Sequence, residues 1–213
     1  MKIPLTLKLK KASHKEIARA QDIIIEELYK VFDQAVLHGG TAIWRCYHGN
    51  RFSEDIDAYI PKNKEKLEIL FKNLEKRGFA VEKKKIADRS VYSNMKFNRT
   101  DVRFEATFKK TEGQLKDYEL ADGNLIVVYT LLPEELIKEK ISAYTNRLKI
   151  RDLYDIFFLL KEVKEREKIE KDLRMLVKDC KKPIDEKELQ VLIIEGLVLP
   201  WEKMLEYIKN WLR

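Results

Sequence analysis

The sequence has few of the residues that cross-link small secreted domains or that are enriched in disordered chains. It contains two cysteines, Cys46 and Cys180, which lack CxxC spacing and have no matching set of histidines. This pattern argues against a disulfide framework and against a zinc site. Only 7 glycines and 5 prolines occur among 213 residues, which argues against a low-complexity chain.

The chain also lacks a long apolar run. The longest one, residues 191–200, is interrupted by Glu195 and is too short to cross a bilayer. The first eleven residues alternate apolar side chains with lysines and contain no apolar core of a signal peptide. We therefore expect a soluble, cytoplasmic protein.

Charged residues, by contrast, are abundant. They make up 37% of the chain beside 45% hydrophobic residues, a balance typical of globular proteins from hot environments. The formal net charge is +7. A basic surface favours polyanionic partners such as nucleic acid or nucleoside triphosphates, although lysines that only maintain solubility would give the same charge.

Hydrophobic periodicity divides the chain into a mixed half and a helical half. The helices predicted in the first half cover 13–37, 41–47 and 64–77. The predicted strands cover 55–60, 79–86, 90–97, 102–108 and 125–130. Ser13 is predicted to cap the first helix, and Pro133 to begin a series of helices. The predicted fold class is α+β, with a mixed sheet flanked by helices in residues 1–125 and a C-terminal helical bundle in residues 126–213.

Two glycines and two aspartates form the most informative pattern. Gly39 and Gly40 end a hydrophobic element and open a short helix, whose N–H groups, with the Thr41 hydroxyl, would attract a phosphate. Asp55 and Asp57 are one residue apart on a predicted strand, so their carboxylates share one face. Such carboxylates repel each other unless a cation lies between them, and Mg²⁺ (or Mn²⁺) suits this place beside triphosphate oxygens. Together the two motifs favour a metal-bound nucleoside triphosphate.

This succession resembles the signature of the minimal nucleotidyltransferase superfamily, and more closely that of the AbiEii/AbiGii toxin family. The matching residues are Gly39, Gly40, Thr41, Ala42, Ile43, Tyr47, Arg51, Ser53, Asp55, Ile56 and Asp57. The turn at residues 48–50 departs from the shorter turn of the family. By resemblance, Arg51 and Ser53 contact the triphosphate or brace the loop.

The resemblance also implies an activity. Gly39, Gly40 and Thr41 would hold phosphate, and Asp55 and Asp57 would hold metal, in a nucleotidyltransferase-like sheet. The implied reaction moves a nucleoside monophosphate from an NTP to an acceptor hydroxyl, on RNA (a transfer-RNA end first) or on protein. The implied biological role is that of the toxin in a type IV-like toxin–antitoxin pair, with an antitoxin protein as a partner. A non-catalytic nucleotide- or protein-binding module and a kinase-like phosphoryl transferase are the alternatives.

A third carboxylate is expected on a neighbouring strand. The alternation from residue 101 to 108 places Asp101, Arg103 and Glu105 on one face. Glu105 is the candidate third metal ligand and the candidate base for the acceptor, and Asp101 is the second choice. A solvent-facing strand with paired charges is the alternative.

Charged residues on apolar helices single out the second half. Lys140 and Arg147, followed by Asp152 and Asp155, resemble the family's Lys-x-x-Ala-x-x-x-Arg helix and Arg-Asp-x-x-Asp motif. Lys140 would reach a nucleotide phosphate with help from Arg147, and Asp152 or Asp155 would hold these cations or the acceptor. The alternative is a buried pair between Arg151 and Asp155, because buried charges need partners.

Basic residues interleaved with aromatic ones occupy the predicted hairpins of the first half. They could bind RNA through phosphate contacts and stacking. Equally, they could form a solvated hairpin that protects the edge of the sheet. The residues are Lys83, Lys84, Lys85, Arg89, Tyr92, Lys96, Phe97, Arg99 and Arg103.

Overall fold

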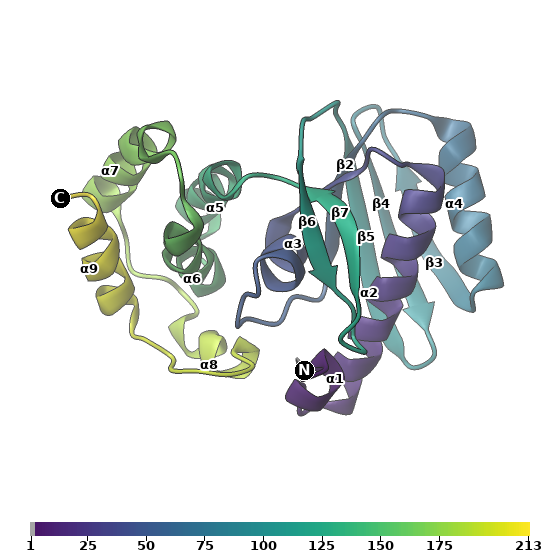
Figure 1. Ribbon diagram of the computed structural model, residues 1–213, viewed down its shortest axis with the longest axis horizontal. Helices are drawn as coiled ribbons and strands as arrows, with labels where there is room; N and C mark the ends of the chain where they lie inside the picture. The colour runs from purple at the N-terminus through teal and green to yellow at the C-terminus, as the bar shows by residue number, and fades with distance from the viewer. Residues whose placement is uncertain (1–2) are drawn as a thin grey trace. The chain divides into compact units, whose positions relative to one another are not determined.

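The structure is a computed structural model that describes residues 3–213. The chain forms two compact units, which Figure 1 colours purple to teal and green to yellow. The first unit contains the described residues up to His48 together with Phe52–Leu131, and the second contains Gly49–Arg51 and Leu132–Arg213. None of the described helices has the length and apolarity needed to cross a membrane.

A mixed sheet of seven strands forms the centre of the first unit, in the order β3-β4-β5-β2-β1-β7-β6. The strands are β1 (Val36–His38), β2 (Ile56–Ile60), β3 (Phe79–Ile86), β4 (Ser90–Phe97), β5 (Thr100–Phe108), β6 (Gln114–Glu119) and β7 (Leu125–Thr130). β2 pairs with β5, and β1 with β7, in parallel. The other neighbouring strands pair antiparallel.

The two faces of this sheet differ in burial. Ile56, Ala58 and Ile60 of β2 are buried, whereas the side chains between them, Asp57 and Tyr59, are half-buried. The same alternation continues on β5 and β4, because residues on a strand point alternately to opposite faces. We call the face that carries Asp57 the polar face and the other one the apolar face.

Four helices accompany the sheet in this unit. They are α1 (Leu5–Lys8), α2 (Ala12–Val31), α3 (Gly39–Cys46) and α4 (Lys64–Lys76). α2 and α4 pack against each other and against β5 and β3, respectively (Figure 1). α4 begins where the Asn63 side chain accepts a hydrogen bond from the Lys66 N–H at 2.9 Å and ends before Gly78, whose φ is +96°. Both ends follow the usual preferences for helix caps.

The first long helix is shorter than the sequence predicts. The helix predicted over 13–37 ends at Val31, and Val36–His38 forms strand β1 instead. The predicted cap is also wrong, since the helix begins at Ala12 after Lys11, and no side chain caps it. Apolar residues near the end of this segment fit a helix or a strand equally well, and pairing with β2 and β7 decides for the strand.

The second unit is helical. Its helices are α5 (Pro133–Arg147), α6 (Ile150–Leu159), α7 (Glu170–Asp179), α8 (Leu189–Leu192) and α9 (Trp201–Trp211), with 3₁₀ turns at Leu160–Glu162, Arg166–Lys168 and Glu186–Glu188. Pro133 occupies the first turn of α5, as predicted, and Leu148 ends this helix in the left-handed conformation with φ of 51°. Leu153 and Ile156 of α6 and Ile208 of α9 are fully buried and belong to its core.

The hydroxyl of Tyr29 connects α2 to the residue before β1 and to β7, and its removal tests this connection. It lies 2.7 Å from the carbonyl oxygen of Ala35 and accepts a hydrogen bond from the Tyr129 N–H at 3.0 Å. Tyr29→Phe should lower the free energy of unfolding by about 1–3 kcal/mol, because buried backbone groups lose their partner. Tyr207→Phe is the matched control, since that side chain is 43% exposed. Equal urea midpoints for the two variants would contradict this assignment.

Candidate active site

The carboxylate of Asp57 lies against the glycine turn that joins β1 to α3. Gly39 has φ of +70°, a conformation that other residues rarely adopt. A Cβ atom at this position would lie 2.1 Å from the Asp57 Oδ2 atom. The antiparallel register explains the approach, because His38 is directly opposite Asp57. Only glycine therefore fits between the turn and this carboxylate.

On the polar face, five neighbouring strands each contribute one polar side chain to a continuous row. Asp57 is in register with Glu105 on β5 and with His38 on β1. Glu105 is in register with Tyr92 on β4, and Tyr92 with Lys85 on β3. Residues paired in this way point to the same face, with Cβ atoms about 5 Å apart. The sheet thus brings Asp57 and Glu105, both predicted site residues, side by side.

Asp55 adds a third carboxylate next to this row. It comes two residues before Asp57 and carries a two-pronged ion pair with Arg103 of β5. The Nε and Nη2 atoms of Arg103 lie 2.7 and 2.5 Å from the two carboxylate oxygens of Asp55. Burial, together with the negative charges of Asp57 and Asp55, raises the pKa of Glu105 even though Arg103 lowers it. The three carboxylates therefore share one electrostatic environment.

Register also separates the two candidates for the third carboxylate. Glu105 is directly opposite Asp57, in the part of β5 that pairs with β2. Asp101 is opposite Lys96 near the beginning of β5, and the pairing of β5 with β2 starts only at Phe104. The fold therefore brings Glu105, and not Asp101, beside the aspartates.

Two buried side chains fix the backbone that leads into β2. The Thr41 hydroxyl donates to the carbonyl oxygen of Asp55 at 2.5 Å, and Thr41 is only 2% exposed. Gln21 of α2 donates from Nε2 to the carbonyl oxygens of Ser53 and Glu54 at 2.9 and 3.1 Å. Gln21 was not among the residues predicted from the sequence, although an amide on the apolar stripe of a helix is a signal for a buried polar contact.

A compact ionic network in the second unit contains the other predicted site residues. The two prongs of Arg51 lie 2.9 and 2.8 Å from the carboxylate of Asp155. Lys140 lies 2.7 Å from Asp155 and 3.5 Å from Asp152, and Arg147 makes two bonds of 2.7 Å to Asp152. Asp152 and Asp155 thus hold Lys140 and Arg147 through ion pairs.

The partner of Asp155 differs from the one expected within the helix. The sequence suggested a pair with Arg151 as an alternative, but the carboxylate binds Arg51, which is 104 residues away. Local spacing favoured Arg151, whereas the Gly49–Arg51 segment folds with the second unit and supplies the closer cation. Burial alone would raise the pKa of Asp155, but Arg51 and Lys140 outweigh burial and hold this pKa below its usual range.

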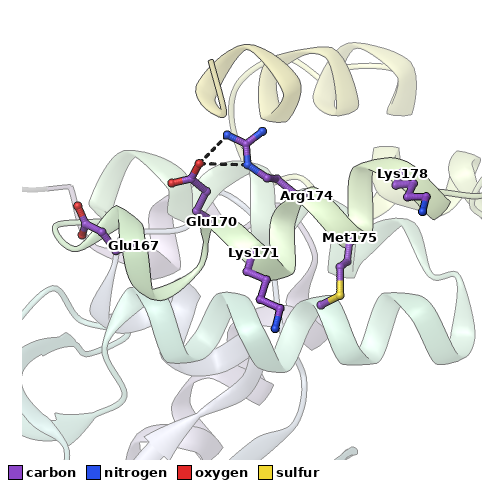
Figure 2. A pocket seen from close by; sticks show the side chains of 6 residues that line it. All are labelled: Glu167, Glu170, Lys171, Arg174, Met175 and Lys178. Carbon is purple, nitrogen blue, oxygen red and sulfur yellow. Dashed lines mark hydrogen bonds and ion pairs between the residues drawn. The ribbon is translucent and has the colours of Figure 1, made fainter.

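A surface hollow of about 500 Å³ along α7 is a different kind of site. Figure 2 shows its lining side chains, with Glu170 paired to Arg174 at 2.5 Å. Lysine and arginine outnumber glutamate in this lining: it contains Lys171, Arg174 and Lys178 but only Glu167 and Glu170. None of the lining residues belongs to the glycine and aspartate motifs or to the polar face of the sheet, so the hollow is separate from the candidate active site.

Comparison with known protein families identifies the family to which this chain belongs. Residues 24–208 match the family described as nucleotidyl transferase AbiEii toxin, type IV toxin–antitoxin system. The chain belongs to the AbiEii family. The matched range covers most of both units and every site residue described above except Gln21. The AbiEii chain is accordingly a nucleotidyltransferase of a toxin family, as the glycine and aspartate motifs indicated.

Solved structures share the fold of this AbiEii chain. JHP933 from Helicobacter pylori superposes with a TM-score of 0.66 at 19% sequence identity, over 95% of this chain and 91% of that one. MenT4, a nucleotidyltransferase toxin from Mycobacterium tuberculosis, gives a TM-score of 0.66 at 19% identity, over 97% of this chain and 86% of that one. A search of curated protein sequences finds no match.

The fit between Gly39 and Asp57 can be tested with a second glycine of similar conformation. Gly39→Ala should strain the backbone and displace the Asp57 carboxylate, whereas Gly78→Ala should only strain the backbone, since its Cβ would lie 3.9 Å from Phe97. Each substitution should cost about 1–3 kcal/mol of stability. Only Gly39→Ala should also lose nucleotidyl transfer, on the order of 100-fold. Full activity in folded Gly39→Ala would refute the role of this contact.

The ionic network of the second unit predicts a large effect of one neutral substitution. Asp155→Asn leaves Arg51 and Lys140 buried with less negative charge, so unfolding should become easier by about 3–5 kcal/mol. Glu206→Gln, which breaks the exposed pair with Lys203, should leave the stability nearly unchanged, because water screens the two charges. Denaturant unfolding compares them, and similar effects of the two substitutions would show that the network contributes little.

Proposed function

We propose that the enzyme transfers a nucleoside monophosphate from an NTP to an acceptor hydroxyl with the help of one or two divalent cations, Mg²⁺ or Mn²⁺. The observation that supports this proposal best is the register of Asp57 with Glu105 beside the Gly39 turn. The membership in a nucleotidyltransferase family supports the reaction type.

The acidic residues present fit such a cation. Within residues 3–213 no three His, Cys, Asp or Glu side chains converge as a preformed metal cage. Mg²⁺ commonly uses one or two carboxylates and completes its shell with substrate phosphates and water, so such a cage is not required. Arg103 already places a positive charge on Asp55, which agrees with a site that attracts cations. When bound, the cation would offset the charge of the triphosphate and of the departing pyrophosphate.

Asp55 and Asp57 are the proposed ligands of the cation. Glu105 is the candidate third ligand, and it has a second proposed role as the base. The acceptor oxygen would form a bond to the α-phosphorus while the bond from that phosphorus to the pyrophosphate breaks. Glu105 would take the proton that the acceptor hydroxyl loses. The N–H groups at Gly39 and Gly40 would face phosphate oxygens at the positive end of α3.

The remaining residues of the motif have proposed supporting roles. Thr41 and Ser53 would act on the nucleotide through the backbone before β2, since the Thr41 hydroxyl and the Ser53 carbonyl are engaged there. From the family resemblance, Lys140 and Arg147 would contact nucleotide phosphates. Asp155 would orient Lys140, to which it is bonded at 2.7 Å.

The acceptor and the biological role follow from charge and family. A formal net charge of +7 favours a polyanionic acceptor, so we propose RNA, with a transfer-RNA end first and a protein hydroxyl second. The family is described by its type IV toxin–antitoxin system, and MenT4, which shares the fold, is a nucleotidyltransferase toxin. Both support a role as a toxin controlled by an antitoxin protein.

Transfer of radiolabel from NTPs tests the proposed reaction. Each NTP, labelled at the α- or the γ-phosphate, is incubated with Mg²⁺ and total RNA or total protein. Label should pass to an acceptor from the α-position only, and Asp57→Asn should reduce this transfer by on the order of 100- to 1000-fold. Asp33→Asn, at an exposed position outside the site, is the matched control.

Three other results would decide against the proposal. Transfer from the γ-position would indicate a kinase-like enzyme. NTP binding without transfer to RNA or protein would indicate a binding module. Equal transfer by wild type and Asp57→Asn would remove the carboxylates from the reaction.

A further inference from the structure

The polar face continues from the carboxylates onto the hairpin of β3 and β4. Tyr92 of β4 is directly opposite Glu105, and Lys85 of β3 is opposite Tyr92. Neighbouring strands lie about 4.8 Å apart, so Lys85 is roughly 10 Å from Glu105 across the sheet. The hairpin therefore presents an aromatic ring and a cation beside the residue proposed to receive the acceptor's proton.

Strand alternation divides the three consecutive lysines of β3 between the two faces. Lys83 is opposite Asn94 and Lys85 opposite Tyr92, so both lie on the polar face. Lys84 points to the apolar face, where its ammonium lies 3.0 Å from Glu68 and 4.9 Å from the centre of the Phe71 ring. A register shift between Val81 and Lys83 produces this arrangement.

The polar side of the hairpin combines two means of holding a nucleic acid. The Lys83 ammonium lies 5.4 Å from the centre of the Tyr92 ring, and Lys83 and Lys85 are exposed. Ammonium groups bind phosphates, and the face of a phenol ring stacks on a base. One carboxylate, Glu82, is also present and accepts a long hydrogen bond of 3.4 Å from Asn94.

The geometry points to a binding surface for the single-stranded end of an acceptor RNA, formed by Lys83, Lys85 and Tyr92. We call it the hairpin surface. Lys83 and Lys85 bind phosphates, and Tyr92 stacks on a base close to the hydroxyl that reacts near Glu105. This inference rests on the proposed function and specifies where its RNA acceptor is held.

The chemistry of the hairpin surface favours RNA over a protein partner. The centres of protein interfaces are depleted of lysine, whereas two of the three side chains of the hairpin surface are lysines. The exposed apolar residues of the sheet are instead Leu115, Leu125 and Val127 on β6 and β7. In the strand order, β7 and β6 lie at the end of the sheet opposite to β3 and β4.

Binding of a fluorescently labelled, single-stranded RNA of mixed sequence tests the hairpin surface. Anisotropy is measured without NTP at several KCl concentrations. The Lys83→Ala/Lys85→Ala variant should bind more weakly, and its slope of log affinity against log salt should fall by about 1.4, for two lost phosphate contacts. Lys84→Ala, from the same strand but the opposite face, should keep the wild-type slope.

Stacking is tested separately, with variants that preserve an apolar side chain. Tyr92→Leu should weaken RNA binding by about 5- to 150-fold, and Tyr92→Phe should bind as the wild type does. If Tyr92→Leu and Tyr92→Phe bind equally, or if Lys84→Ala loses as much as the double variant, the hairpin surface is not the RNA site. An equal loss of binding to poly-L-glutamate would indicate an acidic protein partner and would also overturn the inference.

Failure of the hairpin surface to bind RNA can be distinguished from failure of the proposed reaction. Asp57→Asn should lose label transfer but bind the RNA with wild-type affinity, because Asp57 is not part of the hairpin surface. A wild-type protein that transfers label to protein but binds no RNA would overturn the hairpin surface and leave nucleotidyl transfer intact.

Discussion

The contact between the Asp57 carboxylate and the Gly39 turn is the constraint on which the candidate active site depends. The turn can approach only because residue 39 has no side chain and adopts φ of +70°. The carboxylate is at this height on its strand because His38 and Asp57 are directly opposite in the antiparallel pair. The beginning of α3, with its positive end, therefore faces a negative group that the sheet holds in place.

The apolar face of the sheet fixes the register that this contact needs. Ile56, Ala58 and Ile60 are at most 1% exposed, so a slip of β2 by one residue would expose them and bury Asp57. The free energy of burying these side chains thus also orients the aspartates. On the polar face, His38 of β1 stacks on Tyr59 of β2, with ring centres 4.1 Å apart. This contact favours the same pairing of β1 with β2. Core and site are consequently set by one register.

Local pattern predicted much of this arrangement, and long-range pairing supplied the rest. The alternation of β2 to β5 and the succession of glycines and aspartates are local, so the sequence indicated the strands and the shared face of Asp55 and Asp57. β1 and β6 were missed. β1 has three residues, and β6 is a mostly polar edge strand, so neither has a clear period. Gln21, 32 residues from Ser53, could not be identified as a brace from spacing alone.

Two arginines show how burial separates an available carboxylate from a structural one. Arg103 holds Asp55, and Arg51 holds Asp155, each through two short bonds from a residue distant in the sequence. The first pair is partly exposed, at 44% and 24%, so water screens its charges more than those of the second pair. The second is exposed by only 5% and 1%, and breaking such a pair leaves an uncompensated charge. Separating Asp55 from its arginine should therefore cost less free energy than separating Asp155 from its own.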